Sequence, residues 1–148
     1  MATPKSKPKD EDQVRERIES WIEALRAKDV DGVMSHCTPD VLSFDLAPPL
    51  EHRGKEVRRG FEEWFPTWAG RIGYELRDLT ITTSGDLAFS HSLDHLTGKR
   101  TDGEKTDVWF RSTVCLRKLG GAWKVVHVHS SVPFYMDGSY RASVDLQP

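Results

Sequence analysis

At 148 residues, 30% of them charged and 37% apolar, the chain has the length and composition of one globular domain. Its formal net charge of −2 gives no reason to expect nucleic acid or an anionic membrane surface as a partner. No apolar run approaches the roughly 18 to 20 residues that a membrane span requires.

The termini and the cysteines indicate a cytoplasmic protein. Residues 1–12 are rich in Lys, Pro and Asp and lack the apolar stretch of a secretory signal, so we expect a disordered tail there. The domain itself is expected over residues 13–135, followed by a C-terminal extension over 136–148. Without signs of secretion, Cys37 and Cys115 are expected to be free thiols.

Helical periodicity dominates the first half of the chain. One apolar stripe predicts a helix near residues 12–28 and consists of Val14, Ile18, Trp21, Ile22 and Leu25. Asp29 can cap a second, short helix that carries Cys37, and a short strand follows at residues 41–45. A third amphipathic helix begins after Gly54, and Pro66 ends it.

The second half alternates with the period of strands. Four stretches are predicted, over residues 74–82, 87–97, 105–119 and 123–132, with turns at 84–86, 98–103 and 120–121. Three helices followed by a meander indicate an α+β domain, with the helices on one face of an antiparallel sheet.

The third long strand carries bulky side chains on both faces. One face has Val108, Phe110, Val114 and Leu116, and the other has Trp109, Arg111, Thr113 and Cys115. Three helices can cover only one face, and a solvated face would be plainly polar. We therefore expect the second face to meet another copy of the chain, giving a homodimer through the sheet with Trp123, His127 and His129 near the interface.

Several short segments, in this order and spacing, carry a family resemblance: 24–29 (ALRAKD), 39–41 (PDV), 53–56 (RGKE) and 121–130 (GAWKVVHVHS). From Val14 to Phe134 the chain resembles the SnoaL-like, ketosteroid-isomerase-like branch of the nuclear transport factor 2-like superfamily. The resemblance implies a cone-shaped domain, with three N-terminal helices on a strongly curved antiparallel sheet and an internal pocket. It does not imply one function, because the superfamily holds isomerases, dehydratases, hydrolases, cyclases and domains without catalysis.

The ketosteroid isomerase pattern can be laid on this chain, but two of its residues are missing. By that resemblance Asp45 occupies the position of the general base. Trp21 and Cys115 stand where the enzymes carry a Tyr and a protonated Asp that stabilise the oxyanion. A thiol is a weak donor and an indole N–H has a different reach, so a true ketosteroid isomerase is rejected.

The same register implies which residues face the pocket, although alternation alone groups them only within each strand. The catalytic candidates are Asp45, His91 and Arg111. The ligand-binding candidates are Trp21, Phe89, His95, Trp109, Thr113, Cys115, Val128 and Ser130.

Each candidate has a structural alternative. Asp45 could be a proton-accepting base, or it could pair with Arg111 in a buried polar network. Arg111 would otherwise hold a ligand carboxylate, enolate or phenolate, because a buried guanidinium needs an anionic partner. His91 could shuttle protons or be a hydrogen-bonded strand residue, and Trp21 could serve core packing.

A metal site and a bound cofactor are not expected. His127 and His129 would point to the same side of a strand, which suits a metal, but no third ligand is evident on that face.

Two hypotheses for function follow. The first is a cofactor-independent isomerase, cyclase or dehydratase that transfers protons on a small anionic or carbonyl-bearing organic molecule. The alternative is a non-catalytic ligand-binding or dimerisation domain. Missing oxyanion donors favour the second, whereas Asp45 beside polar pocket residues favours the first.

Overall fold

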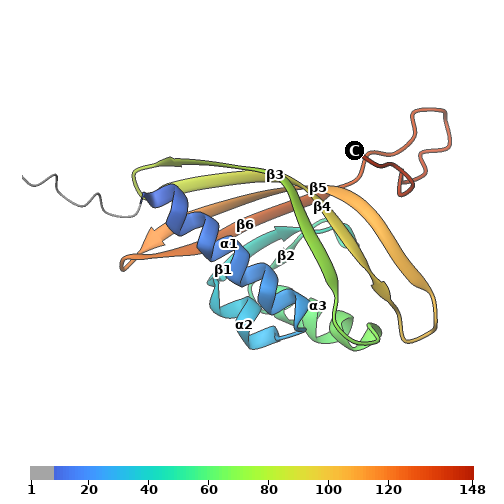
Figure 1. Cartoon of the computed structure of the whole chain (residues 1–148), viewed down its shortest axis with the longest axis horizontal. Coiled ribbons are helices and arrows are strands. Elements are labelled where there is room, and N and C mark those ends of the chain that lie inside the picture. The colour runs from blue at the N-terminus through green and yellow to red at the C-terminus, as the bar shows by residue number, and fades with distance from the viewer. Residues whose placement is uncertain (1–8) are drawn as a thin grey trace, which may run out of the picture.

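The computed structural model describes residues 9–148 and has three helices against one six-stranded sheet (Figure 1). The helices are α1 (Asp10–Arg26), α2 (Val30–Ser35) and α3 (Lys55–Trp64), with a 3₁₀ turn η1 (Phe65–Thr67) after the last. The strands are β1 (Cys37–Phe44), β2 (His52–Arg53), β3 (Gly73–Ser84), β4 (Leu87–Lys99), β5 (Lys105–Leu119) and β6 (Ala122–Ser131). The α+β class predicted from the sequence is confirmed. None of the described helices is long and apolar enough to cross a membrane.

Helix α1 begins at Asp10, two residues earlier than expected, so the end of the predicted tail is helical. Residues 1–8 of that tail lie outside the described residues. Three acidic residues in the first turn interact favourably with the positive end of the helix dipole. The predicted apolar stripe is buried in full and comprises Val14, Ile18, Trp21, Ile22 and Leu25.

The caps of the short helices follow from single residues. Asp29 caps α2 as predicted, because its side chain accepts a hydrogen bond from the Gly32 N–H at 3.0 Å. Cys37, however, opens β1 rather than ending α2. Before α3, Gly54 has φ +56°, and a Cβ there would lie 2.9 Å from the Pro39 carbonyl oxygen, so glycine is required.

The sheet is mixed, not purely antiparallel. Its strand order is β2-β1-β6-β5-β4-β3, and β1 runs parallel to β6 while every other neighbouring pair is antiparallel. The antiparallel prediction was wrong for β1 because the intervening helix and meander bring that strand beside β6 in the same direction. The strong curvature and the internal pocket that the resemblance implies are not shown by the structure.

The β5–β6 hairpin closes at the predicted pair Gly120-Gly121, with φ values of +56° and +82°. Two consecutive left-handed residues suit a two-residue hairpin loop, and only glycine adopts them without strain. In β3 the register shifts between Arg77 and Thr80, around Asp78 at φ +57°. Such a bulge bends the strand locally.

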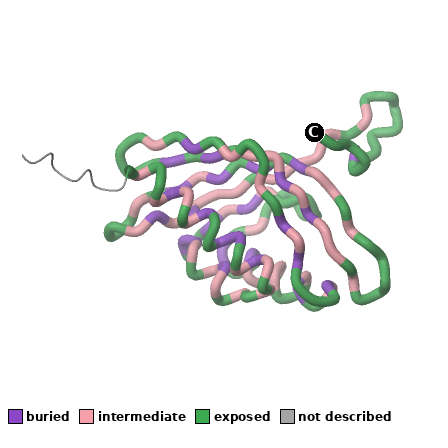
Figure 2. The backbone as a smooth tube through the Cα atoms, in the orientation of Figure 1, coloured by how far each residue is buried: buried purple, intermediate pink, exposed green. Residues whose placement is uncertain are grey.

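The face of the sheet under the helices, called the inner face here, is the opposite of the predicted one. On β5 the buried inner residues are Phe110, Ser112, Val114 and Leu116, and Figure 2 shows this alternation of buried and exposed positions. Trp109, Arg111, Thr113 and Cys115 therefore lie on the other side, called the outer face. On β4 the same reversal puts Phe89, His91, Leu93 and His95 outside. The grouping by alternation was right, but both sets carry bulk, so periodicity could not decide which one the helices cover.

Strand β6 keeps the predicted orientation because of a bulge. Leu116 pairs with Val125 and Cys115 with His127, which leaves one extra residue, Val126, between the two pairs. Val128 accordingly belongs to the inner face and His127 to the outer face, as predicted. Trp123 does not lie near an outer interface as expected, because it is 2% exposed and part of the core.

Candidate functional site

The three catalytic candidates are not brought together. His91 and Arg111 are exposed on the outer face, whereas Asp45 is exposed just after the end of β1. The Asp45 carboxylate accepts a hydrogen bond from the Leu46 N–H at 2.7 Å. Both predicted roles of Arg111 required it to lie in the interior: pairing with Asp45 in a buried network, or holding a ligand anion. That placement was wrong because β5 turns its arginine away from the helices.

The ligand-binding candidates divide between the two faces. Trp21, Val128 and Ser130 lie on the inner side, where the resemblance places them. The outer face carries Phe89, His95, Trp109, Thr113 and Cys115. There His95 stacks on Trp109 with ring centroids 4.2 Å apart, and its Nε2 lies 2.6 Å from Asp107 Oδ1.

A buried acid on β4 is the central polar feature of the inner face. Asp94 is 1% exposed, and its carboxyl accepts hydrogen bonds from the Tyr74 hydroxyl and, at 2.5 Å, from the Ser92 hydroxyl. Burial raises the pKa of Asp94, and these two hydrogen bonds offset only part of the rise. The carboxyl is therefore held closer to its neutral form than an exposed one.

Tyr74 responds to the same surroundings and to Asp45. Burial raises the pKa of the Tyr74 phenol well above its ordinary value, and the charges of Asp94 and Asp45 add to the rise. The phenol thus remains a neutral hydrogen-bond donor. Because Asp45 acts on it electrostatically, the exposed carboxylate and the buried pair belong to one neighbourhood.

Serines connect these groups across the sheet. Ser92 on β4 lies opposite Ser112 on β5, and Ser112 lies opposite Ser130 on β6. This serine row continues toward Asp45. Phe44 of β1 pairs with His129 of β6, and because the two strands are parallel, the residues that follow them, Asp45 and Ser130, lie side by side. Ser112 is buried, Ser92 and Ser130 are half-buried, and Asp45 is exposed, so the row runs from the interior to solvent.

Trp21 contributes a donor with no acceptor. It is 7% exposed, and its buried indole N–H has no hydrogen-bond partner among the described residues. A buried unsatisfied donor typically costs about 1–3 kcal/mol. An acceptor oxygen supplied by a ligand would remove that cost, although Trp68 and Trp123 share the same feature elsewhere in the core.

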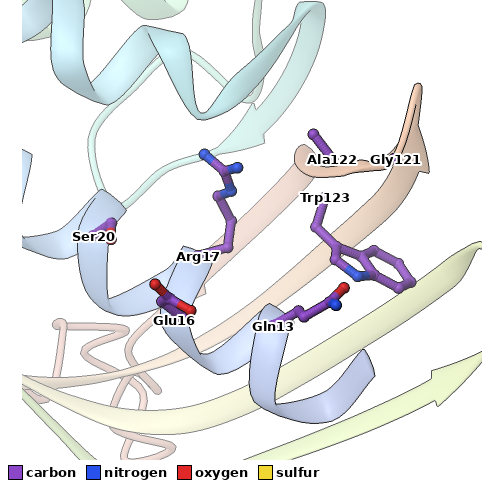
Figure 3. A pocket seen from close by; sticks show the side chains of 7 residues that line it. All are labelled: Gln13, Glu16, Arg17, Ser20, Gly121, Ala122 and Trp123. Atoms are coloured by element: carbon purple, nitrogen blue, oxygen red, sulfur yellow. The ribbon is translucent and has the colours of Figure 1, made fainter. Parts of the chain in front are cut away.

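Two hollows are open to the surface. One, of about 310 Å³, lies between α1 and the β5–β6 hairpin, and Figure 3 shows its lining: Gln13, Glu16, Arg17, Ser20, Gly121, Ala122 and Trp123. The other, of about 430 Å³, lies beside Arg26 and the start of β3. Neither is the predicted internal pocket, because no residue of the serine row lines either of them.

Asp94, Tyr74, Ser92 and Ser112 were missed by sequence reasoning. The signal was present on β4, where Ala88, Ser90, Ser92, Asp94 and Leu96 alternate as a set of mostly small residues. A sheet carries small side chains where helices or a ligand approach it closely. The sequence-based prediction instead placed the bulkier alternate residues of β4 on the inner face.

The paired histidines of β6 do not form part of a metal cluster in the described part of the chain. His127 Nδ1 lies 2.8 Å from the Leu42 carbonyl oxygen, and both His127 and His129 pack edge-on against Phe44. No group of three His, Cys, Asp or Glu side chains among residues 9–148 is arranged to hold a metal ion.

Comparison with known proteins agrees with this architecture. The sequence model of the SnoaL-like domain matches residues 14–135. A solved NTF2-like protein of unknown function from Pseudomonas putida KT2440 is 33% identical, with a TM-score of 0.85, covering 94% of this chain and 96% of its own. The chain therefore belongs to the SnoaL-like domain family within the NTF2-like superfamily.

More distant structures share the fold alone. A ketosteroid isomerase-like protein from Erwinia carotovora atroseptica is 21% identical with a TM-score of 0.73, covering 84% of this chain and 97% of that one. A CaMKII hub from S. rosetta is 22% identical with a TM-score of 0.73, covering 85% and 98%. No protein of curated function matches the sequence.

Proposed function

We propose that the domain binds a small neutral organic molecule carrying a carbonyl or hydroxyl group, between the helices and the serine row. The observation that carries this proposal is the buried Asp94–Tyr74–Ser92 cluster, in which Asp94 is hydrogen-bonded to two hydroxyl groups. Groups with perturbed pKa values are concentrated at functional sites. The unsatisfied N–H of Trp21 adds a donor that a ligand oxygen could use.

The charge of the inner face favours a neutral ligand over an anionic one. The inner-facing residues of β4, β5 and β6 include one acid, Asp94, and no Lys or Arg, because Arg111 faces outward. With Asp45 beside the row, an anion would face two carboxyl groups. The nearby guanidinium of Arg26 is engaged by the Tyr74 carbonyl oxygen, at 2.6 and 2.9 Å. The anionic class of ligand, which depended on an interior Arg111, is therefore not part of the proposal.

The chemistry that fits is proton transfer without a cofactor. A protonated Asp94, hydrogen-bonded to Tyr74, would donate to a carbonyl oxygen, while Asp45 at the other end of the row would accept a proton from the adjacent carbon. These two transfers turn the ketone into its enol. Asp45 would then return its proton to a different carbon, which isomerises the molecule, or to a β-hydroxyl that leaves as water, which dehydrates it, while the enol proton returns to Asp94. The assignment of Asp45 as the base remains the sequence-based one. The role of proton carrier passes from His91 to Asp94, and the anion-holding role of Arg111 is not retained.

The test is ligand binding to the whole chain. Mass spectrometry of the purified protein would identify any co-purified molecule, and calorimetric titration with small cyclic ketones and phenols would measure affinity. We expect Asp94→Asn and Trp21→Phe to weaken binding at least about tenfold. Asp107→Asn, which changes an outer-face carboxylate, is the matched control. Equal affinities in all three variants, or no binding of any probe, would reject the proposal.

A second candidate function, self-association through the outer face, is favoured by the apolar side chains that this face exposes. Phe89 is 45% exposed, Cys115 opposite it on β5 is half-buried, and so is Trp109 further along that strand. The fold is shared with a hub domain. We propose a homodimer through it, which a sedimentation mass of one chain at micromolar concentration would contradict.

A further inference from the structure

The C-terminal arm, defined here as residues 133–148, is a folded hairpin that projects beyond the sheet. It leaves the end of β6 and runs away from the body of its own domain (Figure 1). Phe134 bridges to Ala142, the Tyr135 N–H donates to the Arg141 carbonyl at 2.8 Å, and the Ser143 N–H donates to the Pro133 carbonyl at 2.8 Å. These bonds fix one shape for the arm without support from the helices or the sheet.

The arm joins several of its polar side chains by hydrogen bonds within itself and exposes large apolar side chains to solvent. The Tyr135 hydroxyl donates to Asp145, and Ser139 donates to Asp137, so polar atoms are satisfied within the arm. Five of the ten large apolar side chains exposed in the described chain lie here: Phe134 (51%), Met136 (83%), Tyr140 (68%), Val144 (55%) and Leu146 (46%). Phe134 and Tyr140 contact each other, with ring centroids 5.7 Å apart. Exposed apolar side chains gathered on one segment are typical of an interaction site.

The chain also carries a surface that complements the arm. The outer face of β4, β5 and β6 exposes Phe89 and half-exposes Leu93 and Trp109, which suits the apolar side of the arm. The same face is basic, with Arg111, Arg117, His91 and His129, whereas the acid Asp107 is already engaged by His95.

The charges of the arm have the opposite sign. It contributes Asp137 and Asp145 against the single cation Arg141. Complementary potentials favour the encounter of two surfaces and suppress wrong partners.

We propose that the C-terminal arm packs on the outer face of a second copy of this chain, so that two chains exchange arms. The arm cannot reach its own outer face in this conformation, because it points away from the sheet (Figure 2). It starts at the end of β6, which borders the outer residues of β5, so a copy stacked on that face would lie beside the arm. This rests on the self-association proposed above and adds the arm as its second element.

Twofold symmetry makes the arrangement self-limiting. A closed dimer requires a surface that is complementary to itself. The chain meets this requirement because it carries both the arm and the outer face that would bind the arm. The match to the Pseudomonas putida structure covers 94% of this chain, which is more than residues 1–135 would make up, so it extends past the end of the family model into the arm.

The test compares two variants with the parent chain by analytical ultracentrifugation over a range of concentrations. Met136→Ser combined with Tyr140→Ser removes two arm side chains that make no contact needed for the core. Leu50→Ser removes an even more exposed apolar side chain (95%) from the loop between β1 and β2 and is the matched control. We expect the arm variant to raise the dimer dissociation constant about tenfold or more, with the control unchanged.

A photocrosslinking amino acid at position 136 locates the arm. In a mixture of isotopically light and heavy chains, we expect light-to-heavy crosslinks to outer-face peptides of β4 and β5. A parent dimer that both variants leave intact, without such crosslinks, would overturn the arm exchange while self-association stands. A monomeric parent chain would overturn both proposals. Neither result bears on small-molecule binding at the serine row, which is measured separately.

Discussion

Replacing Leu116 by Ala tests which face of β5 is buried. Leu116 is 0% exposed and lies between Ala88 of β4 and Val125 of β6, so its side chain is enclosed by neighbours on both sides. Removing a fully buried leucine typically costs about 2–5 kcal/mol, through lost burial and the cavity left behind. For a chain of this size, about 2–4 °C of melting temperature is lost per kcal/mol, which gives a shift on the order of 10 °C.

The measurement is denaturant unfolding followed by tryptophan fluorescence, with Thr113→Ala as the control. Thr113 is on the same strand but exposed on the outer face, and its truncation should change the unfolding free energy by no more than about 0.5 kcal/mol. Repeating the unfolding measurements of both variants at a tenfold higher protein concentration separates any effect on self-association from the effect on the folding of the single chain. Equal losses in the two variants, or a larger loss for Thr113→Ala, would refute the orientation of the sheet.

Three further results are expected. Because burial raises the pKa of Asp94, the folded chain holds that proton more tightly than the unfolded chain does. Its contribution to stability is therefore complete at low pH and is lost as pH rises from about 3.9 through the folded pKa. Asp94→Asn should remove this loss, so the stability of the variant relative to the parent chain should increase between pH 3.5 and neutral in paired melting curves. A stability difference between the two proteins that does not change with pH would contradict the assignment. Asp29→Ala should cost about 1 kcal/mol of unfolding free energy by removing the cap of α2, and a neutral result in chemical denaturation would show that the cap is dispensable. Burial raises the pKa of Cys37 to about 12, so Ellman's reagent should label half-exposed Cys115 first, and a fast phase that survives Cys115→Ser would contradict this order.

Several parts of the candidate site could be predicted and several could not. The resemblance placed Trp21, Val128, Ser130 and Asp45 on or beside the inner face, because those positions follow from the helix stripe and the ends of β1 and β6. It put His91 and Arg111 inside, because the register taken from the resemblance differs by one residue from the register of β4 and β5 in the structure, which reverses their faces. The buried Asp94 was overlooked because the same register turned its side of β4 outward.

The sequence by itself determined the elements and the residues that share each of their faces. Period-3.6 spacing defined the buried stripe of α1, period-2 spacing divided β4 and β5 into two sets, and Gly120-Gly121 defined a hairpin, since these are local consequences of backbone geometry. Only the tertiary structure decided which set lies under the helices. Strand periodicity is symmetric between the two faces, and a single bulge at Val126 changes the relation between neighbouring strands. The pairing of β1 with β6 likewise depends on chain segments far apart in sequence, and it is this pairing that brings Asp45 to the end of the serine row.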